Sequence, residues 1–372
     1  MSYIVVLGAE RWKAQTTRTQ HLLSWLAQKH QILFFQPSPA RFSRSPYKSE
    51  YKKPCRKPLP NVRVYTLPPS FDLRNQDHPR MMEMNRSSLV KYVREKCQKH
   101  HFRNYLLWLC SPVYAPLLDD LGSQGMVYDC YQDWAQFDIR WESLIANRAD
   151  LLFAASPGLV DHLSPCNTNI GLLPNGGDAR LFQQAHDLTI RTPTRLLPYN
   201  GPMLGYLGDV GRKTDLRPVY LAAKAHSHWH FFFAGRCSAA NPSASLLSGM
   251  RNVHFLGRIH RRDLPEYAAS FHVLFHLLDT RDPDEDVIPS RIYEYLTTGK
   301  PIAAMYPENY SPVYSDLIYG ARSGKEFVRA CEQALLEKSS YATRQRMIRG
   351  EQADWPLRGE QAEQMLRRNS LL

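Results

Sequence analysis

The sequence predicts an α/β protein with two doubly wound domains, each a largely parallel sheet covered by helices. Short, continuously apolar runs such as Tyr3–Leu7 alternate with helical stretches, which is typical of parallel strands buried on both faces. The runs form two series, separated by a polar and Pro-rich stretch at 183–202 that we interpret as a linker. A length of 372 residues with 43% hydrophobic content is sufficient for two cores.

The first series begins with a strand over Tyr3–Leu7 that ends at Gly8. A helix is predicted to follow over 18–30, with its leucines on one face at helical spacing. Further strands of this series, all continuous apolar runs, are predicted at 31–36, 105–110, 126–129 and 151–155, and residues 171–178 form a strand end with a turn.

The second series follows the linker with the same alternation. Strands are predicted at 203–208, 230–234, 252–256, 272–278 and 301–306, and helices at 215–228, 263–271 and 290–298. Ligands of doubly wound sheets bind outside the carboxyl ends of the strands. We therefore expect the functional site in a cleft between the two domains.

Composition excludes several classes of protein. The longest apolar stretches, such as 105–110, are far shorter than the roughly 18–20 residues of a membrane-spanning helix. The first residues resemble a β-strand rather than a signal peptide. The seven cysteines are scattered and include no Cys-x-x-Cys pair, which argues against a disulfide scaffold or a zinc ribbon and favours free thiols in a reducing cytosol.

The positive charge is concentrated in the first quarter of the chain. Residues 1–100 carry 19 Lys and Arg against 6 Asp and Glu, although the whole chain has a net charge of only +12. The densest part, 41–63, interleaves basic residues with aromatic ones and includes Lys52, Lys53, Arg56 and Lys57. Such a segment fits an anionic membrane surface, a phosphate-bearing acceptor or a nucleic acid, and a solvated loop without a partner is the alternative.

Common cofactor motifs are absent. Gly205, Gly208 and Gly211 are spaced by three and do not form Gly-x-Gly-x-x-Gly, so a nicotinamide or flavin fingerprint is missing. Gly299-Lys300 lacks the other residues of a phosphate-binding P-loop and is better interpreted as a helix end. We therefore expect no cofactor.

Two patterns could suggest a metal. His226, His228 and His230 alternate across a predicted helix end and strand start, where their side chains need not converge. The acidic triplet at 282, 284 and 286 lacks the Gly and Glu positions of a calcium loop. We expect a solvated loop there and no metal site.

Residues 279–305 carry the clearest chemistry. A strand ends near residue 278, and Pro289-Ser290 is a favourable helix start. The unpaired N–H groups of Ser290 and Arg291, the helix dipole and the Arg291 charge form an anion site. Glu294 lies one turn later on the same face, where a carboxylate would meet the ribose hydroxyls of a nucleotide. The alternative is an ordinary amphipathic helix with a surface Glu–Arg pair.

The stretch Pro289-Ser-Arg-Ile-Tyr-Glu-Tyr-Leu-Thr-Thr-Gly-Lys-Pro-Ile302 resembles the Pro-x-Lys-x-Tyr-Glu-Tyr-Leu-Ala-x-Gly-Lys-Pro-Val signature of GT-B glycosyltransferases. The nearest type is the retaining family 4 group, in the branch of teichuronic-acid and other exopolysaccharide transferases. Further stretches resemble the family in the same order, namely Arg18-Thr-Gln-His-Leu22, Val127-Tyr-Asp-Cys-Tyr-Gln-Asp-Trp134, Leu173-Pro-Asn-Gly-Gly-Asp178 and Asn252-Val-His-Phe-Leu-Gly-Arg258. The resemblance therefore covers most of the chain.

This resemblance implies roles for individual residues. Glu294 would bind the donor ribose, and the helix start at Ser290 and Arg291 would hold the diphosphate. Asp286 stands eight residues before Glu294, where the family's Glu-x7-Glu pattern has its first Glu, and would touch the donor sugar. The other donor residues implied are Gly208, Lys213, Gly257, Arg258 and Ile259. On the acceptor side the candidates are Arg18, His21 and Asp133, and Asp133 would be the base if the enzyme inverts.

The resemblance also implies the GT-B organisation, with two Rossmann-like domains facing one another across a cleft. The expected domains are 1–197 on the acceptor side, 198–345 on the donor side, and 346–372 as a C-terminal helix that returns to the first domain and is anchored by Trp355.

The activity implied is transfer of a sugar from a UDP- or GDP-sugar to a lipid-linked or polysaccharide acceptor, with retention and without a metal. The expected location is cytoplasmic, peripheral to the inner face of the membrane. Two alternatives remain open: a non-catalytic nucleotide-binding partner with the same fold, and a basic protein that binds nucleic acid or membranes.

Overall fold

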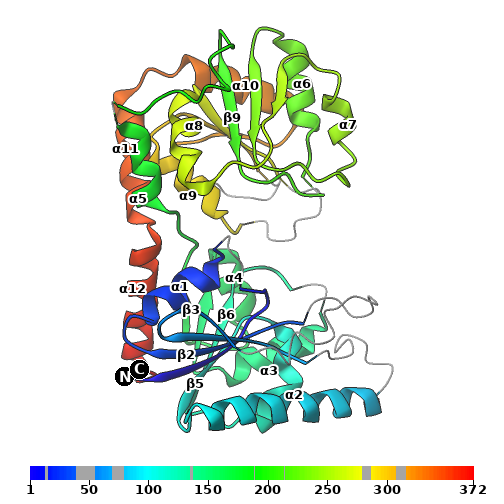
Figure 1. Ribbon diagram of the computed structural model, residues 1–372, viewed down its shortest axis with the longest axis vertical. Coiled ribbons are helices and arrows are strands. Elements are labelled where there is room, and N and C mark those ends of the chain that lie inside the picture. Colours follow the sequence, from blue (N-terminus) through cyan, green and yellow to red (C-terminus); the bar gives the residue numbers. More distant parts are fainter. Residues whose placement is uncertain are drawn as a thin grey trace. The chain divides into compact units, whose positions relative to one another are not determined.

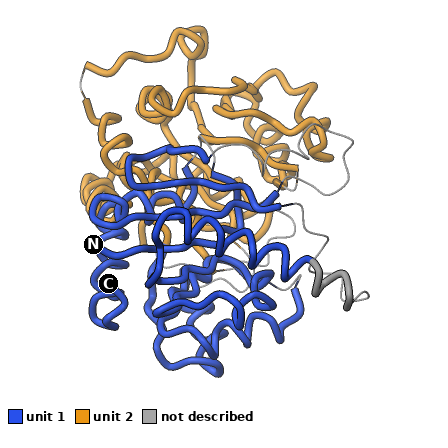
Figure 2. The backbone as a smooth tube through the Cα atoms, turned by 60° about the horizontal axis from the view of Figure 1, so that its bottom comes forward, with its two compact units in different colours: residues 1–174, 356–372 blue, residues 175–355 orange. Residues whose placement is uncertain are grey.

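The structure, a computed structural model, describes residues 1–12, 16–38, 55–68, 79–134, 137–187, 189–212, 214–278, 286–306 and 316–372. It divides into two compact units (Figure 2). Unit 1 consists of residues 1–174 together with 356–372, and unit 2 consists of residues 175–355. Unit 2 is thus one continuous stretch of chain, whereas unit 1 is built from both ends.

Unit 1 is an eight-stranded sheet with the order β3-β4-β2-β1-β5-β6-β7-β8. All neighbouring pairs are parallel except β3 with β4. Its elements (Figure 1) are β1 (Tyr3–Leu7), α1 (Arg18–Leu26), β2 (Gln31–Gln36), β3 (Arg56–Leu59), β4 (Val62–Thr66), α2 (Pro79–Lys99), β5 (Tyr105–Leu109), η2 (Pro112–Asp120), β6 (Gly125–Cys130), α3 (Ile139–Arg148), β7 (Leu151–Ala154), α4 (Pro157–Leu163), β8 (Ile170–Leu172) and α12 (Trp355–Arg368).

Unit 2 is a six-stranded, wholly parallel sheet with the order β11-β10-β9-β12-β13-β14. Its elements are α5 (Ala179–Phe182), η3 (Gln183–His186), β9 (Met203–Leu207), α6 (Arg217–Ala225), β10 (His230–Ala234), α7 (Ala244–Leu247), β11 (Val253–Phe255), η4 (Arg261–Asp263), α8 (Leu264–Ser270), β12 (Val273–His276), α9 (Ser290–Thr297), β13 (Ile302–Met305), β14 (Tyr319–Ala321), α10 (Gly324–Leu336) and α11 (Ser340–Gln352).

The strands are continuously apolar because both faces of each sheet are covered. In β10 the side chains of Phe231 and Phe233 pack into one core with α6 and α10, and Phe232 packs into the opposite core with α8 and α9. All three rings are fully buried. The helices begin at residues that cap them: the Ser156 and Ser323 hydroxyls accept from backbone N–H groups of α4 and α10.

In both sheets the strand order reverses once, between β1 and β5 in unit 1 and between β9 and β12 in unit 2. At such a reversal the connections leave in opposite directions, and a crevice opens at the carboxyl ends of the two strands. In unit 2 the carboxyl ends of β9 and β12 lie beside the start of α9, so the strand order predicts a ligand site at this edge of the sheet.

The stretch 183–202 is not a linker, contrary to the sequence prediction. Leu196 is only 1% exposed and packs into the core of unit 2. The Arg195 guanidinium donates to the Leu256 carbonyl at 2.6 Å, and the Tyr199 ring lies against Phe232. These contacts attach the stretch to unit 2, and the chain enters this unit at Asn175 rather than at residue 198.

The other boundary also differs from the expected one, because α11 packs against α9 and stays with unit 2. Arg346 of α11 is fully buried and donates to the Gly299 carbonyl and to Glu337. Unit 1 resumes at Pro356. From there α12 lies beside α1 (Figure 1), where the Trp25 indole donates to Glu363 at 3.0 Å. Trp355, the first residue of α12 and the last of unit 2, is buried and donates its N–H to the Gly177 carbonyl.

Among the residues that the structure describes, no helix combines the length and the apolar character that crossing a membrane would require.

Candidate functional site

Helix α9 is fixed over the carboxyl end of β9. The Tyr295 hydroxyl accepts the N–H of Leu207 at 2.8 Å, at a point where β9 no longer pairs with β12. Residues 292–297 of α9 are all buried, so the helix presents its first turn and little else to solvent.

The segment before α5 packs directly on the first turns of α9. A Cβ on Gly177 would lie 2.9 Å from the Glu294 backbone nitrogen and 3.0 Å from the Tyr293 Cβ, so only glycine permits this approach. The Asn175 amide donates to the Ile288 carbonyl at 3.0 Å, which holds the chain just ahead of the helix. The stretch Pro-Asn-Gly-Gly-Asp at 174–178 therefore positions α9.

Glu294 lies in this packed region and is 8% exposed. Its Oε1 accepts a 2.6 Å hydrogen bond from Nη2 of Arg261, and the same nitrogen lies 3.3 Å from Oδ2 of Asp178. Burial raises the pKa of the Glu294 carboxyl, and the Arg261 guanidinium opposes this rise. The result is a buried carboxylate compensated by one arginine.

Arg291 and Gly208 meet at the carboxyl end of β9. The Arg291 guanidinium lies 4.1 Å from the centroid of the Tyr206 ring. A Cβ on Gly208 would lie 2.6 Å from Arg291 Nη2, and Gly208 has a φ of +118°. Both the close contact and the backbone conformation therefore require glycine at this position. Among the described residues no acceptor meets the N–H groups of Ser290 and Arg291, as the start of a helix dictates. The start of α9 thus offers two amide donors and the helix dipole, and the Arg291 guanidinium lies beside Gly208 at the end of β9, which together suit an anion.

His276, the last residue of β12, adds a buried nitrogen to this edge of the sheet. It is 7% exposed, and its Nδ1 has no hydrogen-bond partner among the described residues. Burial, followed by the nearby Arg291 charge, lowers the pKa of His276 to about 3. The imidazole is therefore neutral at physiological pH.

The loop after β11 has the backbone freedom expected of a binding loop. Gly257 has a φ of +70° and open space where a Cβ would be, Arg258 is exposed, and Ile259 packs against the core beneath α8. Asp286 is half-buried in the turn before α9. Lys213 lies outside the described residues.

The alternating histidines have separate surroundings. His226 bonds to Glu332 at 2.8 Å and stacks on Trp229, whereas His230 bonds to His254 at 3.1 Å. Within the described ranges no group of three or more His, Cys, Asp or Glu side chains is arranged to hold a metal ion.

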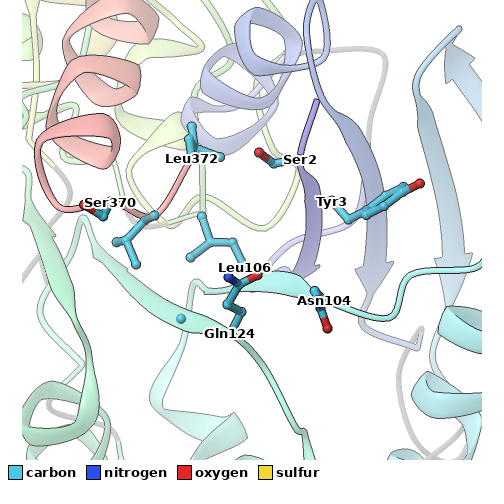
Figure 3. Close-up of a pocket in the computed structure, with 9 residues that line it drawn as sticks. Ser2, Tyr3, Asn104, Leu106, Gln124, Ser370 and Leu372 are labelled. Carbon is cyan, nitrogen blue, oxygen red and sulfur yellow. The ribbon is translucent and has the colours of Figure 1, made fainter.

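A hollow of about 140 Å³ lies in unit 1, at the edge of the sheet where the parallel strands begin (Figure 3). It is bordered by residues at the amino ends of β1, β5 and β6, including Tyr3, Leu106 and Gln124, and by the last residues of the chain. Ligands of doubly wound sheets bind at the carboxyl ends, so we do not assign the site to this hollow.

The whole architecture matches solved structures over nearly its full length. Sucrose-phosphate synthase from Thermosynechococcus elongatus aligns with a TM-score of 0.71 and 15% identity, covering 99% of both chains. HepE of Anabaena, in complex with UDP and glucose, aligns with a TM-score of 0.66 and 16% identity, covering 98% of this chain and 99% of that one. The chain has the GT-B fold. At these identities the likeness concerns the fold alone.

The GT-B chain also resembles a curated protein in sequence. It is 26% identical over 257 residues to a protein of Bacillus subtilis that carries a provisional assignment as the teichuronic acid biosynthesis glycosyltransferase TuaH. The match covers 62% of this chain and spans 63% of the relative's length. No model of a known protein family matches the chain.

In this GT-B structure four of the residues predicted for unit 2 lie close together. Glu294, Arg291, Ser290 and Gly208 meet around the first turn of α9. Sequence reasoning missed four neighbours of this group, namely Asp178, Tyr206, Arg261 and His276. Asp178 lies inside and Arg261 lies beside a stretch that carries the family resemblance. This position was the sequence signal that could have identified them.

In unit 1 the residues predicted for the acceptor side and the membrane do not share one environment. Arg18 is not on the surface, since it forms a buried ion pair with Asp129 at 2.9 Å. His21 is half-buried on α1, and Asp133 is half-buried in the loop after β6. Arg56 and Lys57 are exposed on the edge strand β3, whereas Lys52 and Lys53 lie outside the described residues.

Proposed function

We propose that this protein is a glycosyltransferase that binds a nucleoside-diphosphate sugar at the first turn of α9 in unit 2. The observation that carries the proposal is the spacing of an anion site and a buried carboxylate on one helix. Ser290 and Arg291 supply donors for a diphosphate, and Glu294, one turn later, supplies acceptors for the ribose hydroxyls. HepE, which shares the fold, binds UDP, and this supports UDP as the first nucleotide to test.

The same groups would promote loss of the diphosphate. Negative charge builds on the leaving diphosphate as the bond to the sugar breaks, and donors already aimed at it stabilise that charge. The helix amides and the Arg291 guanidinium do this without a metal. Asp286, just ahead of the helix, would contact the donor sugar. Retention of the anomeric configuration is our expectation from the family resemblance.

Unit 1 would hold the acceptor, a lipid-linked or growing polysaccharide, and would dock on an anionic membrane face in the cytoplasm. The likeness to a protein assigned to teichuronic acid biosynthesis supports a cell-surface glycan. Cations gather near one edge of unit 1: burial and the charges of Arg63, Lys99 and Lys57 lower the pKa of His100. Binding to anionic vesicles that weakens with added salt, and no binding to neutral vesicles, would be the expected behaviour.

The first experiment is a thermal-shift panel of UDP, GDP, CDP, ADP and dTDP, each with and without EDTA. A ligand at about 100 times its dissociation constant adds about 2.7 kcal/mol of stability. We expect one diphosphate to raise the melting temperature equally with and without EDTA, and Glu294→Ala to abolish that shift. No shift with any nucleotide would contradict the proposed donor site.

Turnover separates the enzyme from a non-catalytic nucleotide-binding protein. The observation that favours a test of the non-catalytic protein is that Asp286 stands where the family has a Glu. Incubation with the selected nucleotide sugar and a membrane extract should release the free diphosphate, and NMR of the product would report the anomeric configuration. Tight binding without release of diphosphate would favour the non-catalytic protein.

A further inference from the structure

Among the residues that the structure describes, Arg261 makes the strong contact that holds the carboxylate of Glu294. Only 10% of its side chain is exposed, and its Oε1 accepts a 2.6 Å hydrogen bond from Arg261 Nη2. The two residues are 33 positions apart, on α9 and on η4. A buried carboxylate without such a partner would take up a proton rather than stay charged.

Arg261 is itself positioned by a second carboxylate. Its Nη2 lies 3.3 Å from Asp178 Oδ2, and Asp178 Oδ1 accepts the N–H of Leu181 at the start of α5. Asp178 and Glu294 therefore hold the guanidinium through the same nitrogen. The result is a chain of three charges in which the arginine lies between two acids.

The contact with Arg261 uses only part of the acceptor capacity of the carboxylate. An ionised carboxylate offers about four acceptor positions on two oxygens, and Arg261 uses one of them. A ribose presents two neighbouring hydroxyls, which donate best to a carboxylate that is charged and held still. A protonated carboxyl would lose part of this acceptor capacity.

The other charged groups around Glu294 do not replace Arg261. Arg291 acts in the same direction, but its guanidinium is stacked on Tyr206, and Asp178 acts in the opposite direction. Three charged residues near α9 have their own partners: Arg346 bonds to Glu337, Glu351 to Gln183, and Asp354 to the N–H groups of Ala179 and Trp355.

We propose that Arg261 is a positioning residue that keeps Glu294 ionised and oriented for the ribose hydroxyls of the donor. This inference rests on the proposed function, since it gives that site's carboxylate its charge state. It also makes discrimination between ribose and deoxygenated sugars dependent on Arg261, although Arg261 lies outside the helix that forms the rest of the site.

The test compares the dissociation constants of UDP and 2′,3′-dideoxy-UDP by calorimetry at about pH 6 and about pH 8.5. If the thermal-shift panel selects guanine, GDP and its dideoxy analogue are used instead. Taking the ratio of the two constants cancels the titration of the phosphates, which both ligands share. The unsubstituted protein should prefer the ribonucleotide by roughly ten- to a hundredfold at both pH values, because hydrogen bonds to a charged acceptor are lost in the analogue.

Arg261→Gln should lose this preference at about pH 6 and regain part of it at about pH 8.5, because burial then raises the pKa of Glu294 without the opposing guanidinium and the carboxyl ionises only as the pH rises. Arg261→Lys, which retains the charge, should keep the preference at both. Arg262→Gln is the matched control, since Arg262 is exposed, belongs to the same short helix η4 and, within the described part of the chain, pairs with its neighbour Asp263.

The outcomes separate the two proposals. An unsubstituted protein that binds UDP and its dideoxy analogue equally would overturn both the ribose site and the role of Arg261. A clear preference that Arg261→Gln leaves unchanged at about pH 6 would overturn the role of Arg261 alone. A variant whose preference is lost equally at both pH values would also contradict the inference, because that result indicates displaced structure rather than a changed charge.

Discussion

Gly177 shows how one residue determines the position of the candidate site. Its backbone lies against the Glu294 amide, so closely that a methyl group would approach the backbone nitrogen to 2.9 Å. The neighbouring atoms belong to a buried helix and have little freedom to move. The glycine is thus a requirement of packing.

Gly177→Ala should therefore displace α9 and weaken nucleotide binding together with stability. Overpacking of this kind costs about 1–3 kcal/mol. Denaturant unfolding and the thermal shift with the selected diphosphate would measure both effects. Gly249→Ala is the matched control, because nothing lies within 4 Å of a Cβ at Gly249. Equal behaviour of the two variants would contradict the packing argument.

Arg18 and Asp129 form a buried ion pair in unit 1, with side chains 5% and 0% exposed. Arg18→Met should destabilise the protein by about 3–5 kcal/mol, because it leaves the Asp129 charge buried without its partner. Replacing both residues by apolar ones should recover much of this loss. Arg140→Met breaks the exposed pair with Asp138 and should have little effect on stability. A small effect of Arg18→Met in denaturant unfolding would show that the pair does not support the fold.

At the scale of elements, α12 is attached to α1 through Glu363. The Trp25 indole of α1 and the amine of Lys29, just after this helix, donate to the carboxylate, and so does Arg367 within α12. Burial tends to raise the pKa of Glu363, but the hydrogen bonds from Arg367, Lys29 and Trp25 outweigh it and lower the pKa to about 2.

This low pKa predicts a dependence of stability on pH. The ionised Glu363 contributes to stability above its unfolded pKa, and the contribution is lost as pH falls from about 4.5 to about 2. Glu363→Gln should cost about 2 kcal/mol at neutral pH, allowing for the solvent screening of Lys29 and Arg367, and should make no further difference at about pH 2. Glu360→Gln, on the exposed face of α12, should have little effect at either pH. Acid titration of the melting temperature would measure this.

Helix α9 illustrates what an element reveals before its surroundings are known. The Pro289-Ser290 start and the spacing of Arg291 and Glu294 predicted a helix with a charged first turn, and the structure has this helix. The attachment to β9 through Tyr295 and the contact with Arg261 come from residues far away in sequence. Local spacing contains no information about such partners.

At the scale of the whole molecule, unit 2 is a continuous stretch and unit 1 is not. A fragment of residues 175–355 should therefore fold cooperatively and keep the thermal shift with the selected diphosphate. A fragment of residues 1–174 should be unstable, because α12 covers Trp25 and Gly171. Adding a peptide of residues 356–372 should restore it in part. A stable 1–174 fragment, judged by circular dichroism on heating, would contradict this division of the fold.

The sequence predicted the central strands well and the periphery poorly. The strands over Tyr3–Leu7, Gln31–Gln36 and His230–Ala234 have the predicted bounds, because both of their faces are buried and the sequence is apolar throughout. The edge strand β3, Arg56–Leu59, was missed because it carries charged residues and a proline. Helix α11 was missed because its pattern is largely polar, although it packs against α9.

By itself the sequence determined the class of fold, the two series of strands and the helix that carries Ser290, Arg291 and Glu294. Each of these depends on residues close together in the chain. Only the tertiary structure decided where unit 2 begins, that Arg18 is buried, and that Arg261 and Asp178 meet Glu294. Such contacts join residues that are 33 to 111 positions apart. They form because a buried charge is stable only when it is paired. Only the packing of the sheets determines which partner lies within reach.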